Sequence, residues 1–271
     1  MLSKITGGPT TFLYKARILS KYDVSFFKCD ETGFIQTEDP YWMEEAYSSA
    51  ITKLDLGLVQ RNMDLAELVH PIIMKYFDHT GSFLDYAGGY GLFTRLMRYR
   101  GFDFYNTDIY CDNLFAEFND LKFAEKGKRF ELTTAFEVFE HLPSPIPEIE
   151  AMMAYSDNLL FSTVVVPDEI PQPGQWWYFS LETGQHVAFY SIKSLEYLAK
   201  KFDKHFYSNG ETVHLFTKKQ LSSNPFKQSF GTSFARKLIK TAKSLERTIN
   251  GRKENLLGKD TEAAKKRISG K

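Results

Sequence analysis

A glycine-rich turn follows a short apolar run and is the clearest candidate for a ligand-binding segment. The run and turn read Phe83-Leu84-Asp85-Tyr86-Ala87-Gly88-Gly89-Tyr90-Gly91. Glycine permits positive φ angles and a close approach of ligand to backbone, and the helix expected from Gly91 offers unpaired N–H groups. The turn lacks the Gly-Lys-Ser/Thr sequence of nucleoside-triphosphate sites, and Asp85 would repel phosphate. We therefore expect Asp85 to meet a cationic amino-acid group.

A second acid, Asp108, ends the next apolar run, roughly twenty residues beyond the glycines. An acid in this place suits the two hydroxyls of a ribose, as in dinucleotide sites. The simpler alternative is a glycine-rich turn with an acid that only caps a helix.

Two of the six histidines, His141 and His186, lie where such a fold is expected to bind a second substrate, the acceptor of a transferred group. His186 follows a Pro- and Trp-rich loop, and loops at the carboxyl ends of parallel strands form such sites. We predict it to be a general base, which a hydroxyl nucleophile needs at neutral pH. A packing role and metal ligation stay open for His186, as do a structural role and acceptor contact for His141. No metal site is predicted, because Cys29 and Cys111 lack zinc-site neighbours.

Four aromatic residues in and after the same loop are predicted to contact the substrate. They are Trp176, Trp177, Tyr178 and Tyr190. Flat aromatic faces suit sugar rings, but tryptophan pairs also anchor loops to a core. Both interpretations stay open at this point.

The elements that must position these residues follow from the pattern after residue 82. Short apolar runs alternate with helical segments there, which predicts parallel β-α-β units. Strands are expected at 82–86, 102–106, 131–136 and 158–165, and an antiparallel pair at 205–208 and 212–217. Helices are expected at 91–99, 112–118, 146–154 and 191–201.

Residues 1–77 are predicted to be an N-terminal extension with helices at 42–54 and 58–77. Pro71 is expected to bend or break the second of these helices. The extension could close over the site as a lid, and its candidate contacts are Tyr41, Tyr47, Arg61 and Asn62. Residues 1–40 give no pattern that predicts an element.

A basic tail at residues 221–271 is predicted to follow the ligand-binding domain at 78–220. From residue 218 onward the chain has 15 Lys and Arg against 4 acids, although the overall formal charge is zero. Apolar residues recur at helical spacing at Phe234, Leu238, Ala242, Leu245 and Ile249. Three interpretations of this amphipathic helix stay open: docking on the acidic body or plain solvation, binding to a membrane surface or a glycan-assembly partner, and binding to nucleic acid, which we expect least. The sequence has no signal-peptide pattern or long apolar run, so we expect a cytoplasmic protein.

The turn and Asp108 resemble the first two motifs of class I S-adenosylmethionine methyltransferases. These motifs are written Asp-x-Gly-x-Gly-x-Gly with an acid after the second strand, and Ala87 replaces the first glycine here. Residues 134–142, which end in Glu140-His141-Leu142, resemble the family's fourth-strand motif. The segments 176–178, 184–186 and 189–191 are similar to a subgroup associated with bacterial polysaccharide and glycan gene clusters.

The resemblance implies an α/β fold with a Rossmann-like, seven-stranded, mostly parallel sheet and helices on both faces. It implies S-adenosylmethionine as cofactor, with its methionine part on Gly88–Gly91 and its ribose on Asp108. Ile109 would border the adenine, and Phe136 and Glu137 would flank the sulfonium. The predicted reaction is methyl transfer to a hydroxyl of a sugar or glycan precursor. The alternatives are an RNA or protein methyltransferase, a non-catalytic cofactor-binding assembly factor, and a nicotinamide-dependent enzyme.

Overall fold

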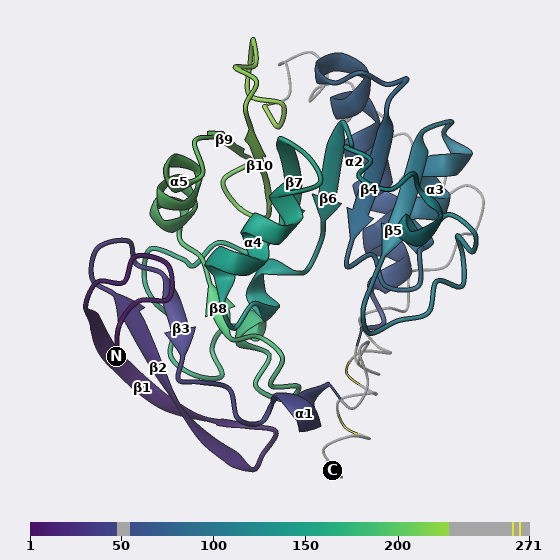
Figure 1. Cartoon of the computed structure of the whole chain (residues 1–271). Helices are drawn as coiled ribbons and strands as arrows, with labels where there is room; N and C mark the ends of the chain where they lie inside the picture. The colour runs from purple at the N-terminus through teal and green to yellow at the C-terminus, as the bar shows by residue number, and fades with distance from the viewer. Residues whose placement is uncertain (48–54, 228–261, 263–265, 267–271) are drawn as a thin grey trace, which may run out of the picture.

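A six-stranded sheet forms the centre of the computed structural model, which describes residues 1–47, 55–227, 262 and 266 (Figure 1). Its strand order is β5-β4-β6-β7-β10-β9. The strands are β4 (Ser82–Tyr86), β5 (Asp103–Thr107), β6 (Leu132–Ala135), β7 (Asn158–Ser162), β9 (His205–Ser208) and β10 (Val213–Thr217). The first four strands of this order are parallel neighbours, and β10 is antiparallel to β7 and β9. The prediction of a mostly parallel α/β sheet is confirmed.

The predicted seventh strand is absent from the described residues. At the edge outside β5 only an isolated parallel bridge joins Asn106 to Asp120. The helix predicted at 112–118 is also wrong, and a short 3-10 helix, η1 (Leu121–Phe123), follows the irregular segment. Asn113 accepts a hydrogen bond from the Ala116 N–H and donates one to the Ala116 carbonyl. Such local side-chain bonds compete with the helical backbone pattern.

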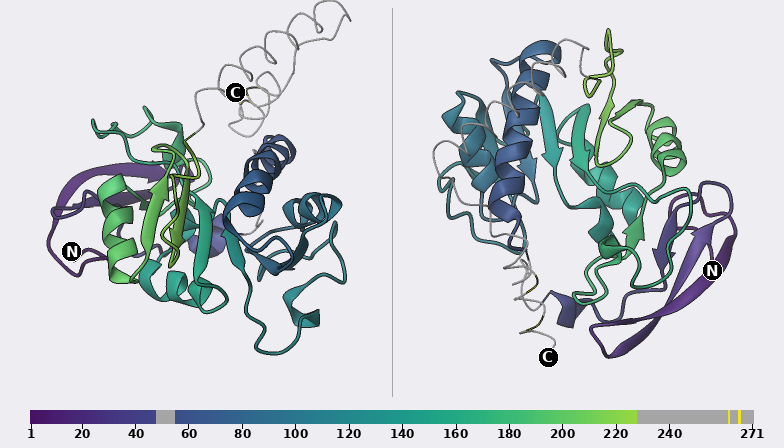
Figure 2. Two further views of the ribbon diagram at one scale, coloured as in Figure 1. Left: turned by 90° about the horizontal axis from the view of Figure 1, so that it is seen from above. Right: turned by 180° about the vertical axis from the view of Figure 1, so that it is seen from behind.

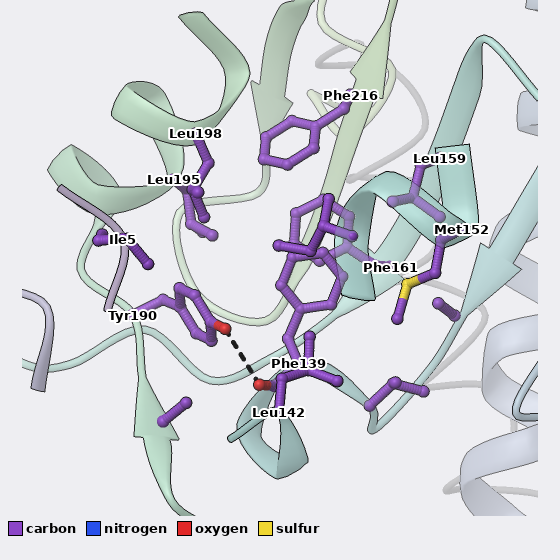
Figure 3. Close-up of a cluster of buried hydrophobic side chains, with 14 of the residues drawn as sticks. Ile5, Phe139, Leu142, Met152, Leu159, Phe161, Tyr190, Leu195, Leu198 and Phe216 are labelled. Atoms are coloured by element: carbon purple, nitrogen blue, oxygen red, sulfur yellow. Dashed lines mark hydrogen bonds between the residues drawn. The ribbon is translucent and has the colours of Figure 1, made fainter. Parts of the chain in front are cut away.

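Helices cover both faces of the sheet, as predicted, and Figure 2 shows α5 and α2 on opposite sides of it. One face packs against α2 (Leu58–Tyr76) and α3 (Leu92–Tyr99), and the other against α4 (Pro145–Met153) and α5 (Ile192–Lys201). Alternation along β7 explains this, because Leu160 packs in the α2 and α3 cluster while Phe161 packs in the α4 and α5 cluster. Figure 3 shows the second cluster, in which the Tyr190 hydroxyl donates to the Phe139 carbonyl at 3.1 Å.

Helix α2 continues through Pro71, so the proline does not break the helix, the stronger of the two predicted effects. A proline inside a helix removes one backbone hydrogen bond. The buried face of α2, which includes Val69, Ile72 and Ile73, packs on the sheet and outweighs that loss.

The first 40 residues, for which the sequence predicted no element, form a second sheet. Its antiparallel strands are β1 (Thr10–Ile18), β2 (Tyr22–Cys29), β3 (Ile35–Thr37) and β8 (Ala188–Phe189). Because β8 lies in the connection after β7, this sheet lies at the carboxyl end of the central strands (Figure 1). Two helices, α1 (Met43–Ala46) and α2, lie within residues 1–77 after this sheet.

Two predicted segments lie outside the described residues. They are the second half of the helix expected at 42–54 and the amphipathic helix of the tail. In the part of the chain that is described, no helix combines the length and apolar character needed to cross a membrane.

Candidate functional site

The predicted cofactor segments meet at the carboxyl edge of three neighbouring strands. Asp85 on β4 is in register with Asn106 on β5 and with Thr134 on β6. The glycine turn, Asp108 and Phe136 follow these three residues in the chain, so they emerge side by side. This edge is where open α/β sheets bind ligands.

The turn after β4 has a backbone shape that requires glycine. Gly89 and Gly91 have φ angles of 55° and 78°. A Cβ on Gly88 would lie 2.1 Å from Asn106 Oδ1 and 2.3 Å from Asp85 Oδ2. Ala87, in the place of the family's first glycine, also has a positive φ, of 54°. The departure from the motif therefore leaves the left-handed turn intact.

The carboxylate of Asp108 ties the turn to the end of β5. Its Oδ2 accepts from the Gly89 N–H at 2.9 Å, and its Oδ1 accepts from the N–H groups of Tyr110 and Cys111 at 2.7 and 2.8 Å. A carboxylate has about four lone-pair sites, so acceptor capacity remains for ribose hydroxyls. Ile109, the predicted adenine wall, is 87% exposed beside it.

Asp85 lies beneath the turn, and this position revises its predicted direct contact with a cationic ligand group. It is buried, accepts a hydrogen bond from Thr134 Oγ1 at 2.7 Å and another from Thr94 Oγ1 at 3.4 Å. Burial raises the pKa of its carboxyl to about 7, and the nearby Asp108 adds to the shift. Asp85 therefore supports the underside of the turn.

Glu137 has a strained backbone at the end of β6. Its φ is 55°, and strain of this kind at a non-glycine residue costs about 1–3 kcal/mol and is found at functional sites. Ser162 Oγ accepts from the Glu137 N–H at 2.7 Å and donates to Glu137 Oε1 at 2.6 Å. The neighbouring Phe136 ring packs edge-on against Phe93 at 5.0 Å. Two side-chain contacts thus hold this segment beside the turn.

Two of the four predicted lid residues reach the site. Arg61 Nε lies 3.8 Å from Glu137 Oε2. Tyr47 stacks on Tyr110 with ring centroids 5.2 Å apart and meets the His141 ring edge-on at 6.1 Å. The other two, Tyr41 and Asn62, lie elsewhere: Tyr41 is 64% exposed, and Asn62 donates to a carbonyl of its own helix.

The two predicted histidines come together, and they meet Glu140, for which the sequence predicts no role. Glu140 and His141 belong to the 3-10 helix η2 (Phe139–His141), and His186 comes from the connection before β8. One potential ligand atom from each of the three side chains lies within 4.8 Å of the other two. The Glu140-His141 pair was visible in the sequence, but its proximity to His186 depends on tertiary structure.

Both histidines are neutral, with their Nδ1 atoms bound to backbone. His141 Nδ1 donates to the Gln185 carbonyl at 3.1 Å, and His186 Nδ1 donates to the Tyr178 carbonyl at 2.7 Å. Burial lowers the pKa of His141 to about 4 and that of His186 to about 3. A neutral imidazole with its proton on Nδ1 has a lone pair on Nε2.

Glu140 is fully buried, and neither of its carboxylate oxygens accepts a well-formed hydrogen bond from the described residues. Burial and the charge of Glu137 raise its pKa, while the hydroxyls of Tyr178 and Thr163 beside it oppose the shift. A buried carboxylate with so few partners is costly unless a cation or a proton compensates it.

Most aromatic side chains of the loop that contains Trp176, Trp177 and Tyr178 pack against neighbouring buried residues and hold the loop in place. Trp176 packs on Phe179 at 5.0 Å, and the buried Tyr178 packs on His186 at 4.7 Å. Tyr190 is buried in the core shown in Figure 3, where its hydroxyl is bound, so its predicted substrate contact is not available. Trp177, by contrast, is 73% exposed. Of the four predicted aromatic contacts, it alone offers an open ring face.

A family model described as a methyltransferase domain matches residues 59–203. The chain belongs to this methyltransferase family. The match begins inside α2 and ends just after α5, and it includes the turn, Asp108 and the Glu140, His141 and His186 cluster. The predicted enzyme class is thereby confirmed.

Several solved structures are similar to this chain. They include an O-methyltransferase family 2 protein from Planctomyces limnophilus solved with apigenin (15% identity, 64% of this chain, 63% of that chain, TM-score 0.42). Magnesium protoporphyrin IX methyltransferase from Synechocystis with bound S-adenosylhomocysteine is 12% identical over 65% of this chain and 92% of that chain (TM-score 0.43). An O-methyltransferase family protein from Burkholderia thailandensis is 11% identical over 68% and 64% (TM-score 0.47). The chain thus spans less than two thirds of the Planctomyces and Burkholderia proteins. A search of curated protein sequences gave no match.

Proposed function

We propose that this protein transfers the methyl group of S-adenosylmethionine to a hydroxyl of a small-molecule acceptor, a sugar or a glycan precursor. The observation that carries the proposal is the junction of the glycine turn with Asp108, one strand away from the Glu140, His141 and His186 cluster. The cofactor supplies an electrophilic methyl group on a sulfonium. The chain must hold acceptor and cofactor in line and exclude water.

The residues at the edge of β4 and β5 fit such a cofactor. Gly88 has no space for a Cβ, and the positive φ angles of its neighbours bring backbone N–H and carbonyl groups to the surface of the turn. Asp108 would hold the ribose hydroxyls, with Ile109 as the apolar wall for the adenine. Phe136 and Glu137 would border the sulfonium end.

The acceptor hydroxyl binds at the histidine cluster. His186, the predicted base, is neutral and has its Nε2 lone pair unprotonated, which is the form that accepts a proton. The exposed face of Trp177 supports a sugar as acceptor, because an aromatic face packs well on a pyranose ring.

The decisive experiment is a calorimetric titration of S-adenosylhomocysteine into the wild-type protein and Asp108→Ala. We expect binding by the wild type and at least a tenfold loss in the variant, since charged hydrogen bonds contribute about 1.5–3 kcal/mol. Asp23→Ala, which removes an exposed acid of the N-terminal hairpin, is the control and should bind normally. Folded wild-type protein without affinity would refute the proposal. Radiolabelled methyl transfer to a panel of UDP-, GDP- and CDP-linked sugars then tests the acceptor class.

A further inference from the structure

We propose that Glu140, His141 and His186 form a divalent metal site that binds an oxygen atom of the acceptor. One ligand atom from each residue lies within 4.8 Å of the other two. Two ligands bound to a metal at about 2.1 Å in tetrahedral geometry lie about 3.4 Å apart. The three ligand atoms must therefore move together by up to about 1.4 Å, which side-chain torsions can supply.

The histidines are already oriented as metal ligands. Each uses Nδ1–H to donate to a backbone carbonyl, at 3.1 Å for His141 and 2.7 Å for His186. Metal-bound histidines show this pattern, because the second nitrogen fixes the ring and leaves the first free to coordinate. The two rings meet edge-on with centroids 4.8 Å apart, so both imidazoles border the same small region.

Glu140 supplies the independent evidence for a cation. Its carboxylate is completely buried and has no well-formed hydrogen bond in the described structure. The histidines cannot serve as its donors, because their protons are on Nδ1 and are bound to carbonyls. A divalent cation coordinated by Glu140 compensates the charge of this buried carboxylate.

The ligand set indicates a first-row transition metal. Imidazole nitrogen suits Zn²⁺ and Fe²⁺, while carboxylate also suits Mn²⁺. Three protein ligands leave at least one position open for a ligand that is not part of the chain, as in catalytic sites. The site thus differs from a closed structural metal centre.

The role of the open position rests on the proposed function. An acceptor hydroxyl bound there loses its proton more readily, because a metal ion lowers the pKa of a coordinated oxygen ligand. The proton passes to solvent, the oxygen forms a bond to the methyl carbon, and the bond from that carbon to sulfur breaks. The products are the methyl ether, S-adenosylhomocysteine and one proton. His186 then acts as a ligand instead of a base.

Metal binding itself can be tested without an acceptor. Full-length protein is dialysed against EDTA, returned to chelator-free buffer and titrated with ZnCl₂ and MnCl₂ in a calorimeter. We expect about one equivalent of at least one metal to bind, and at least a tenfold weaker affinity in Glu140→Gln and His186→Ala. His205→Ala removes an exposed histidine of β9 and should retain the affinity. Circular dichroism establishes that each variant is folded, and Glu140→Gln preserves side-chain shape if His186→Ala is unstable.

The outcomes separate this inference from the proposed function. No binding of either metal by the wild type, or equal binding by the folded variants, overturns the metal site. Titration of S-adenosylhomocysteine into the metal-free protein provides the second readout. Metal binding without cofactor binding would support the metal site and refute the proposed methyl transfer. Cofactor binding without metal binding would support the proposed methyl transfer and refute the metal site. Sugar methylation that persists in EDTA would show that the cluster acts without a metal.

Discussion

The amide of Gly89 donates to Oδ2 of Asp108 at 2.9 Å, so the turn after β4 and the end of β5 form one rigid unit. Asn106 strengthens this unit, because its Nδ2 donates to the Gly89 carbonyl at 3.3 Å. Both backbone polar groups of one glycine are thus held from the neighbouring strand. The unit has its shape before any ligand binds, which reduces the entropy cost of binding.

Gly88→Ala should damage this unit, because a methyl group at this position has no space. The new Cβ would lie 2.1 Å from Asn106 Oδ1 and 2.3 Å from Asp85 Oδ2, and both side chains are buried. We expect a loss of about 1–3 kcal/mol in unfolding free energy, as for other overpacked sites, and at least tenfold weaker binding of S-adenosylhomocysteine. Urea denaturation and calorimetry measure the two effects. Gly57→Ala is the control, since its Cβ meets only a side-chain end at 3.8 Å. Equal stability of the two variants would contradict the geometry.

Ala87→Gly should stabilise the protein. The residue has φ at 54°, and the left-handed conformation costs an L-residue other than glycine about 1–2 kcal/mol. Glycine gains unfolded-state entropy of about 0.4–1 kcal/mol, which offsets part of this. We therefore expect a net gain of up to about 1.6 kcal/mol in unfolding free energy, measured as a higher urea midpoint with an unchanged slope. A lower midpoint would show that the Ala87 methyl group contributes packing that exceeds the backbone strain.

Asp85→Asn should remove a pH dependence of stability. Burial raises the folded-state pKa of Asp85 to about 7, against 3.8 as its ordinary value. Below pH 4 the carboxyl is protonated in both states. Between pH 4 and 7 the unfolded state ionises first, so the wild type loses stability as pH rises, by up to about 4 kcal/mol at 1.36 kcal/mol per pKa unit. Above pH 7 the loss is complete.

The comparison of wild type and Asp85→Asn by urea denaturation at pH 4.5, 6 and 8 isolates this effect, because other titrations cancel in the difference. The unfolding free energy of the wild type should fall relative to that of the variant as pH rises. A difference that stays constant, or that changes in the opposite direction, would show that the buried carboxyl is ionised throughout.

The central sheet was predictable from sequence because its strands are short apolar runs separated by helical patterns. Leu159, Leu160 and Phe161 show why even the buried β7 was found, since a continuous apolar run suits a strand covered on both faces. The N-terminal sheet was not predictable. Its strand β3 pairs with Ala188 and Phe189, which lie some 150 residues later in the chain. Nothing local in residues 35–37 specifies that partner.

The cofactor part of the site was predictable because its residues follow consecutive strands. The histidine cluster was not predictable because it joins two segments that are distant in the sequence. Gly89 and Asp108 were found because strand ends recur in a fixed order. Glu140 lies in the segment that resembles the family's fourth-strand motif, yet its burial and its approach to His186 depend on how the long connection after β7 folds back. Asn106 was missed for a related reason, because only the register of β4 with β5 places it under Gly88.

Trp177→Ala should weaken acceptor binding without affecting the cofactor. Its ring is 73% exposed, whereas Trp176 beside it packs on Phe179. A stacking contact of about 0.5–1.5 kcal/mol predicts a two- to tenfold rise in KM for a nucleotide-sugar acceptor, with unchanged affinity for S-adenosylhomocysteine. Phe12→Ala, which removes an exposed ring from β1, is the matched control. An unchanged KM in the Trp177 variant would remove the main support for a sugar acceptor.

Removal of residues 228–271 separates a small-molecule acceptor from a nucleic acid. Residues from 218 onward carry 15 Lys and Arg against 4 acids, a charge that attracts phosphate backbones in a salt-dependent manner. The turn, Asp108 and the histidine cluster all lie before residue 228. We therefore expect the truncated protein to retain its affinity for S-adenosylhomocysteine and its sugar methylation, while any salt-sensitive RNA binding disappears in a filter-binding assay. Retained cofactor binding with lost methylation, restored only by RNA and the full tail, would instead establish the RNA acceptor.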